Sequence, residues 1–210
     1  MIDYQSDIEN LLKNLPVPKN FNQKKIISEV QNVYSEHDLN KIIPELIEDS
    51  LDKRLRAFKV IRSPDDKDSI PGIYLNITRQ GTYVRPHLHN SPNLPVYETF
   101  GIVNEGKVRI IQFFEEGSIH EVGYISQNNP FFTTKPDYYH SFVIPKGIAV
   151  LIELNYSIFN PNSPKTFAQF APEEKYENNV LNIPTQDYIQ DLITKTNPKK
   201  TTNQNLFKTT

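Results

Sequence analysis

Apolar residues between positions 8 and 56 recur every three or four positions, which is the spacing of one face of an amphipathic helix. Ser35 is expected to cap the last of three such helices, and Pro44 to lie in its first turn or to kink it. This zone carries no chemical constellation, so we expect it to cover the rest of the fold or to form a dimer contact. The three helices are marked by Ile8, Leu11 and Leu12; by Ile26, Ile27, Val30 and Val33; and by Ile42, Ile43, Leu46, Ile47 and Leu51.

From about residue 57 to residue 156 the hydrophobic period changes to two, which indicates strands. The turn signals Asn104–Lys107 and Glu115–Ser118 each place Gly where a tight hairpin needs a positive φ. Many short strands joined by hairpins, without intervening helices, predict an antiparallel sandwich or a small barrel. The predicted strands are Ile73–Ile77, Tyr83–His89, Tyr97–Val103, Val108–Phe114, Glu121–Ile125, His140–Ile144 and Ala149–Tyr156.

The last part of the chain is polar and rich in proline. Phe159–Glu174 combines proline with aromatic residues, and a short amphipathic helix is predicted after Thr185 as its cap. Asn197–Thr210 lacks periodicity, which is typical of a mobile tail, with a strap on a partner subunit as the alternative. We therefore expect a helical extension over residues 1–56, a β domain over 57–174, and a helix with a polar tail over 175–210.

Composition excludes several classes of function. The 210 residues contain no Cys, so disulfides, thiolate metal sites and cysteine nucleophiles are absent. Lys and Arg number 23 against 25 Asp and Glu, which gives a net charge of −2 and no footprint of a nucleic-acid binder. No segment approaches the roughly 20 apolar residues of a membrane span, and the acidic start does not resemble a signal peptide. No nucleic acid or membrane partner is expected, and a cytoplasmic location is the default expectation.

Candidate chemistry lies in the β zone, around two histidines that stand two positions apart. His87 and His89 would point to one face of a regular strand, and Tyr83 and Arg85 would share that face. A sheet face that carries Tyr, Arg and two His residues is unusual for a core and suits the wall of a polar cavity.

Two residues further along the chain complete a possible ligand set. Glu98 begins an apolar strand, where a buried carboxylate needs a partner, and His140 starts another strand. Three imidazoles and one carboxylate suit a divalent first-row transition metal, Fe, Mn, Ni or Zn, with coordination positions open to water or substrate.

These residues resemble the cupin superfamily. Gly81-Thr-Tyr-Val-Arg-Pro-His87-Leu-His89 is similar to the start of the first cupin motif, Glu98 and Gly106 to its end, and His140 to the histidine of the second motif. The stretches Glu98–Gly106, Ile152–Leu154 and Phe159–Glu174 resemble the WbuC-type cupin-fold metalloproteins. The resemblance covers residues 51–174. It implies a double-stranded β-helix, often dimeric, with one metal held by His87, His89, His140 and Glu98, and a link to bacterial surface-polysaccharide metabolism.

Two functions remain open at this stage. The first is a metal-dependent enzyme that acts on a small anionic or sugar-derived substrate. The second is a non-catalytic, metal-stabilised protein that binds a sugar or a small acid.

Three further residues are candidates for contact with a small-molecule ligand. Arg85 could clamp an anion or form a structural salt bridge with Glu98 or Glu153. Tyr83 could donate a hydrogen bond to a ligand or to the backbone. Tyr138, which flanks His140 with Tyr139, could face the cavity.

Overall fold

The computed structural model describes residues 2–52, 54–63, 71–89, 96–156, 165–177 and 180–198. The predicted polar tail beyond residue 198 and the first part of the Pro-rich segment lie outside these ranges. The helices are α1 (Tyr4–Leu12), α2 (Gln23–Ser35), α3 (Leu39–Asp52) and α4 (Ile183–Lys195). The strands are β1 (Arg56–Arg62), β2 (Gly72–Arg79), β3 (His87–Leu88), β4 (Glu98–Ile102), β5 (Val108–Phe113), β6 (Ile119–Ile125), β7 (Phe131–Thr133), β8 (Tyr139–Val143), β9 (Ile148–Asn155), β10 (Thr166–Phe167), β11 (Tyr176–Glu177) and β12 (Val180–Leu181).

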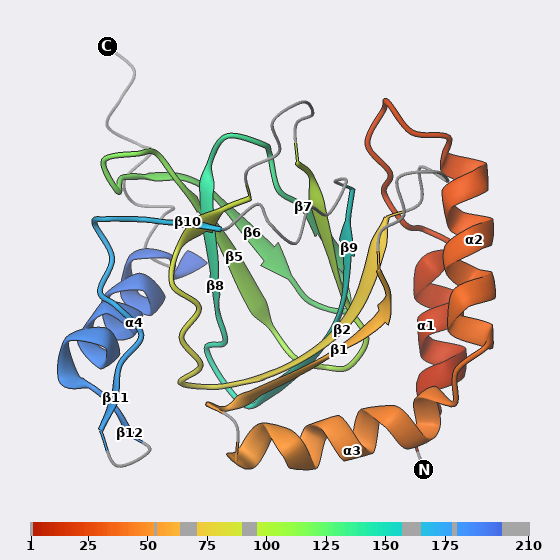
Figure 1. The fold of residues 1–210 in the computed structure, drawn as a ribbon, viewed down its shortest axis with the longest axis horizontal. Coiled ribbons are helices and arrows are strands. Elements are labelled where there is room, and N and C mark those ends of the chain that lie inside the picture. Colours follow the sequence, from red (N-terminus) through yellow and green to blue (C-terminus); the bar gives the residue numbers. More distant parts are fainter. Residues whose placement is uncertain are drawn as a thin grey trace.

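Two five-stranded antiparallel sheets face each other (Figure 1). The first sheet has the order β1-β2-β9-β4-β7, and the second has the order β10-β3-β8-β5-β6. From β2 to β10 the chain alternates between these two sheets, with only the β5–β6 hairpin staying in one, and β11 and β12 pair with each other in a separate two-stranded sheet. This winding is the double-stranded β-helix, so the predicted mainly β fold class is confirmed. Among the described residues the two sheets do not join into a closed barrel.

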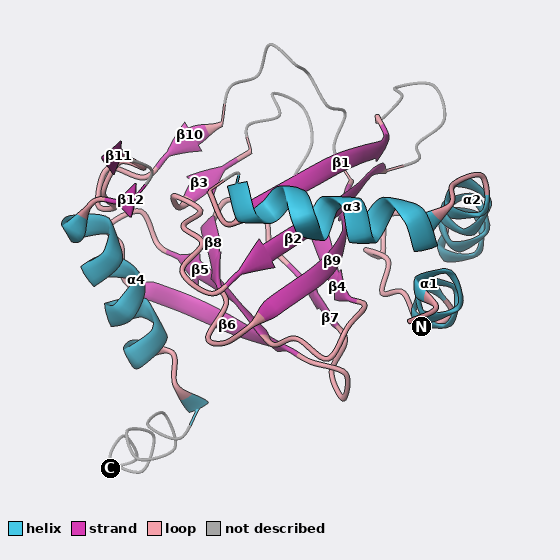
Figure 2. Cartoon of the chain, turned by 90° about the horizontal axis from the view of Figure 1, so that it is seen from below, coloured by secondary structure: helices cyan, strands magenta, loops and turns pink. Residues whose placement is uncertain are grey.

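Helices cover the outer faces of both sheets (Figure 2). Helices α1, α2 and α3 pack on the first sheet, where the odd-numbered residues Ile73, Leu75 and Ile77 of β2 are fully buried against them. Because strand residues alternate between faces, the even-numbered Tyr74 and Asn76 turn toward the interior between the sheets. The sequence left two roles open for this helical zone, a cover for the rest of the fold or a dimer contact, and α1–α3 form such a cover. Helix α4 packs on the second sheet through Ile189 and Leu192.

The helix ends differ in two places from the sequence expectation. Ser35 is the last residue of α2, and its hydroxyl donates to the carbonyl of Asn32, so it does not cap α3. Asp38 accepts from the amide of Lys41 at the start of α3 instead. Asn182, not Thr185, caps α4.

Pro44 lies inside α3, beyond its first turn.

No helix among the described residues has both the length and the apolar character that crossing a bilayer requires.

The two predicted hairpin turns have different outcomes. Glu115–Ser118 joins β5 to β6 with Gly117 at φ 93°, as expected. Asn104–Lys107 is not a hairpin, because β4 pairs with β9 and β7 whereas β5 pairs with β6 and β8. This segment carries the chain from one sheet to the other. Gly106 is needed there for space, since a Cβ would lie 2.6 Å from the carbonyl oxygen of Ile148.

Candidate metal centre

Three histidines meet at one end of the second sheet. His87 in β3 pairs directly with His140 in β8, and His89 follows β3 by one residue. Each offers a ring nitrogen, and these three nitrogens lie within 4.8 Å of one another. His87 and His140 are buried, and the side chain of His89 is 17% exposed. We call His87, His89 and His140 the histidine triad.

Glu98 reaches the histidine triad from the opposite sheet, where it is the first residue of β4. Its carboxylate is almost fully buried, with Oε1 3.1 Å from Nε2 of His89 and Oε2 2.7 Å from Nε2 of His140. Asn155, the neighbour of Glu98 in β9, donates from Nδ2 to Oε1 at 3.1 Å. The structure thus brings together all four residues that the sequence predicted as a ligand set.

The short distances in this cluster are ion pairs between a carboxylate and imidazoles. Glu98 Oε2 and His89 Nε2 are both buried, Oε2 against His140 and Nε2 against Glu98 Oε1. A buried carboxylate therefore lies directly against two ring nitrogens. Neutral imidazole nitrogens and a carboxylate are ligands that divalent first-row metals accept. The residues present therefore fit a metal ion.

The orientation of His87 favours the same use. Its Nδ1 lies 2.9 Å from the carbonyl oxygen of Arg85. A carbonyl only accepts, so Nδ1 carries the proton and Nε2 is the acceptor nitrogen of the ring. Burial, together with the positive charge of neighbouring His140 and Lys165, lowers the pKa of His87 well below its ordinary value. A neutral imidazole held by a backbone carbonyl is prepared for metal ligation.

Glu98 keeps its charge in this position. Burial by itself would raise the pKa of this carboxyl, but His140 and His89 beside it hold the pKa well below its usual range. The cluster therefore combines an ionised carboxylate with a neutral His87 imidazole.

A small cavity of about 10 Å³ adjoins the cluster. Glu98, His89, His140 and Tyr138 are among the residues that line it. That volume corresponds to about one water-sized sphere, so it suits a single ion or water. A much larger groove of about 1310 Å³ lies between β1, the end of α3 and α4, and none of the histidine triad lines it.

Sequence reasoning did not assign a second polar set on the inner face of the first sheet. Asn76 donates from Nδ2 to Oε2 of Glu153 at 2.6 Å, and Tyr74 stands opposite Glu153 across β2 and β9. Burial and the nearby charge of Glu98 raise the pKa of Glu153 to about 7. Burial, with the charges of Glu153 and Glu98, raises the pKa of Tyr74 to about 12. The signal was available, since Glu153 is an acid within an apolar strand.

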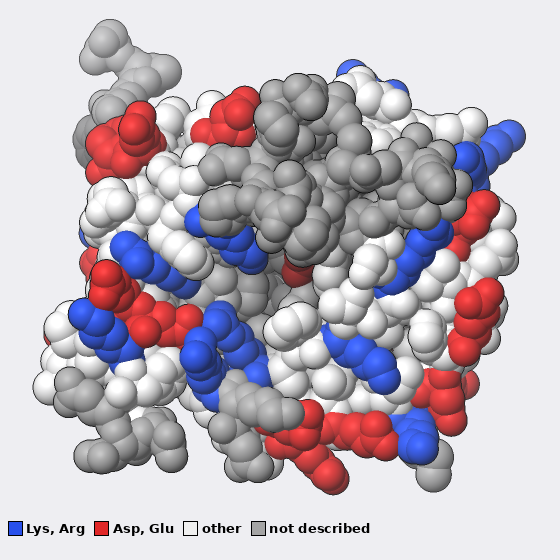
Figure 3. Space-filling view, in the orientation of Figure 1, with Lys and Arg blue, Asp and Glu red and all other residues white. Residues whose placement is uncertain are grey.

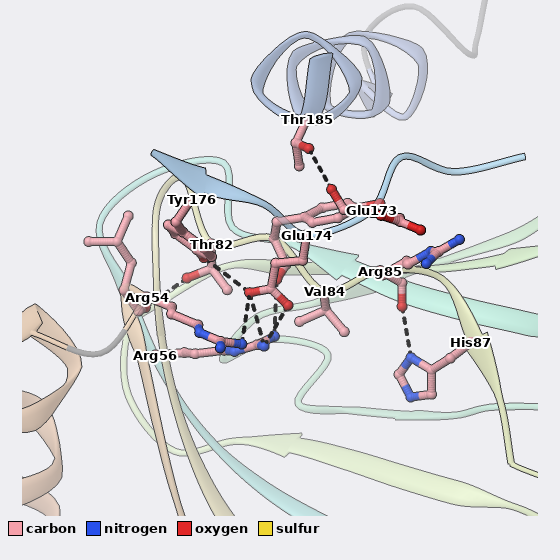
Figure 4. A network of polar contacts seen from close by, with 12 residues as sticks. Arg54, Arg56, Thr82, Val84, Arg85, His87, Glu173, Glu174, Tyr176 and Thr185 are labelled. Carbon is pink, nitrogen blue, oxygen red and sulfur yellow. Dashed lines mark hydrogen bonds and ion pairs between the residues drawn. The ribbon is translucent and has the colours of Figure 1, made fainter. Parts of the chain in front are cut away.

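Arg85 does not share the face of His87, because the regular strand begins only at His87 and residues 82–86 are not extended as β structure. Figure 4 shows its carbonyl turned to the His87 ring and its guanidinium turned away from that ring. The guanidinium donates to the carbonyl of Ala168 at 3.0 Å and stands 5.5 Å from the ring centre of Phe167. Its Nε is buried without a hydrogen bond among the described residues.

The two tyrosines have different surroundings. Tyr83 is buried beneath α4, and its hydroxyl donates to the carbonyl of Pro172 at 2.7 Å. Tyr138 lines the small cavity, and its ring stacks on His120 at a centroid distance of 4.0 Å with 4° between the planes. Only Tyr138 therefore borders the space next to the histidine triad.

Comparison with known proteins identifies no family. No family model matches the chain, and no curated protein sequence matches it. Several solved structures share a similar fold. A cupin-like protein from Thermotoga maritima is 12% identical, with 53% of this chain and 74% of that chain covered and a TM-score of 0.41. A protein with a double-stranded β-helix domain from Klebsiella pneumoniae is 12% identical, with coverage of 54% and 84% and a TM-score of 0.40.

The capsular polysaccharide assembling protein CapF from Staphylococcus aureus is 17% identical, with 77% of this chain and 55% of that chain covered and a TM-score of 0.44. At these TM-scores the likeness adds nothing to what the order of the strands shows.

Proposed function

We propose that this protein binds one divalent first-row transition metal, Fe, Mn, Ni or Zn, through the histidine triad with Glu98 as the fourth ligand. The observation that carries the proposal is the convergence of three histidine ring nitrogens within 4.8 Å of one another, with the buried Glu98 carboxylate 2.7 Å from His140 and 3.1 Å from His89. Imidazole nitrogens and a carboxylate are ligands that divalent first-row metals accept.

The inner face of the first sheet supports a metal-dependent reaction on a small ligand. When bound, the metal would supply a Lewis acid and open coordination positions. Tyr74, whose raised pKa keeps its hydroxyl protonated, offers a hydrogen-bond donor, and Glu153 with a pKa near 7 can hold or release a proton. Asn76 orients the Glu153 carboxylate.

A small anionic or sugar-derived molecule is the ligand class that these surroundings support. Lys and Arg side chains border the left side of a hollow on the face shown in Figure 3, where they could attract an anionic group, and an acidic side chain is visible inside it. Of the three predicted contact residues Tyr138, Arg85 and Tyr83, only Tyr138 lines the cavity beside the histidine triad, so the proposal assigns the ligand contact to Tyr138. The WbuC-type assignment, its link to surface polysaccharide and the homodimer rest on the sequence resemblance and are part of the same proposal. The cytoplasmic location is the default expectation and belongs to it as well.

Elemental analysis of protein purified without an affinity tag tests the metal site. We expect about one metal ion per chain in the natural protein and almost none after the double substitution His87→Ala and His89→Ala. His37→Ala is the matched control, because it removes an imidazole that lies between α2 and α3. Stoichiometric metal in the double variant would contradict the proposal. Turnover of any candidate substrate that disappears with the metal would separate an enzyme from a binding protein.

A further inference from the structure

Lys165 stands at the metal-binding atom of His87, although 78 residues separate the two in the chain. Its Nζ lies 3.1 Å from Nε2 of His87. The residue directly precedes β10, which pairs with β3 so that Phe167 is opposite His87. The pairing of two short strands therefore delivers this ammonium group to the histidine triad.

The two hydrogen-bond partners of His87 fix what Lys165 does there. Because Nδ1 donates to the carbonyl of Arg85, Nε2 is the acceptor. An ammonium group has three donors and no acceptor, so Nζ donates to the lone pair of Nε2. A metal ion would need that same lone pair. One lone pair cannot serve both, so Lys165 and a metal exclude each other at His87.

The positive charge of Lys165 strengthens this exclusion, and its exposed side chain is free to move away. A positive charge 3.1 Å from a coordinating nitrogen repels a divalent cation. The main body of Lys165 is exposed to solvent, so the side chain can swing away without unpacking a core. Tethered by β10, its ammonium remains within a side chain's length of the cluster.

We propose that Lys165 exchanges partners: it caps Nε2 of His87 in the metal-free protein, is displaced when a metal binds, and then holds the anionic ligand of the loaded site. The proposal rests on the proposed metal site and assigns to Lys165 both a lower metal affinity and a higher anion affinity. A residue that only stabilised the fold would change neither.

The first measurement compares the affinity of Lys165→Met and natural protein for Co²⁺, by competition with a chelator. We expect at least about a tenfold tighter affinity in the variant, because both the competing donor and the repelling charge are gone. Lys107→Met, at an exposed lysine outside the histidine triad and the cavity lining, is the control and should bind as the natural protein does. An unchanged or weaker affinity in Lys165→Met would overturn the proposal.

The second measurement titrates Co²⁺-loaded protein with azide and follows the visible absorption of the metal. We expect Lys165→Met to bind azide several-fold more weakly than the natural protein, and equal affinities would overturn the role in anion binding. In metal-free protein the ¹⁵N signal of His87 Nε2 should shift in Lys165→Met, and no shift would overturn the cap. If the natural protein bound no metal at all, the proposed metal-binding function itself would be wrong. The outcomes above would contradict only the role of Lys165.

Discussion

Two carboxylates in this molecule, the buried Glu98 and the half-buried Glu174, each stand between two basic side chains, yet only Glu98 is a candidate for chemistry. Glu174 accepts from Nη2 of Arg56 on both of its oxygens, at 3.1 and 3.0 Å, and from the hydroxyl of Tyr176 at 3.0 Å (Figure 4). Arg54 lies 3.6 Å from the same carboxylate. Every contact there has a donor and an acceptor.

Glu98 has equally short distances, but its partners are two imidazoles that can also act as metal ligands. Its Oε2 lies 2.7 Å from Nε2 of His140, and its Oε1 lies 3.1 Å from Nε2 of His89. The comparison teaches that short distances alone do not identify a metal site. The network around Glu174 connects the segment before β11 to β1, whereas the cluster around Glu98 consists of groups that can act as metal ligands.

Exchanging each carboxylate for its amide should separate these two roles, and we expect this to be the largest effect. Glu98→Gln should weaken metal affinity by more than about 100-fold, because losing even an outer partner of a ligand costs 10–100-fold. Glu174→Gln should leave metal affinity unchanged and lower the free energy of unfolding by about 1.5–3 kcal/mol, as expected for hydrogen bonds to a charged group. Metal titration and urea unfolding of both variants measure this. A loss of metal in Glu174→Gln would remove the distinction.

The pH dependence of stability in metal-free protein should reveal the buried neutral imidazole. Because the pKa of folded His87 is lowered, the unfolded chain takes up a proton below about pH 6.5 that the folded chain refuses. The free energy of unfolding should therefore fall as pH drops below about 6.5, by at most about 1.4 kcal/mol per pH unit from this residue. Urea unfolding between pH 7.5 and 5 tests the slope, and His87→Asn should reduce it. An unchanged slope in that variant would show that His87 is not the group responsible.

Glu153 should act in the opposite direction. Its pKa is raised to about 7, so between about pH 4.5 and 7 the folded protein holds a proton that the unfolded chain has lost. Stability from this group decreases as pH rises through that window, by at most about 1.4 kcal/mol per pH unit. Glu153→Gln removes this opposing contribution, so stability should rise more steeply with pH in the variant than in the natural protein. A shallower rise would mean that folded Glu153 is ionised.

Sequence periodicity identified the elements whose burial is one-sided and regular. The fully buried Ile73, Leu75 and Ile77 produced the period of two in β2, and the apolar faces of α1–α3 produced the helical period. It missed β1 because Arg56–Arg62 lies at the edge of its sheet, where only Ala57 is buried and the consecutive Phe58, Lys59 and Val60 are all exposed. An exposed edge strand leaves no alternation to detect.

The candidate site was predictable only where its residues lie in local motifs. His87 and His89 are two residues apart, and Glu98 and His140 stood out as polar residues at the starts of strands. Lys165 left no such signal, since only the pairing of β10 with β3 brings it to His87. The parity argument for Arg85 was wrong because it assumed a regular strand through Pro86, whereas β3 begins at His87.

The proposed ligands come from both layers of the fold, since His87 and His140 belong to the second sheet and Glu98 begins a strand of the first. An ion held by all of them would act as a clasp between two sheets that are otherwise separate hydrogen-bonded units. Ligands that bind only the folded state slow its opening and raise its apparent stability. In metal-loaded protein the backbone amides of β4 and β8 should then exchange with deuterium as one cooperative unit. The exchange rates of amides in both sheets would therefore report whether the metal site is occupied.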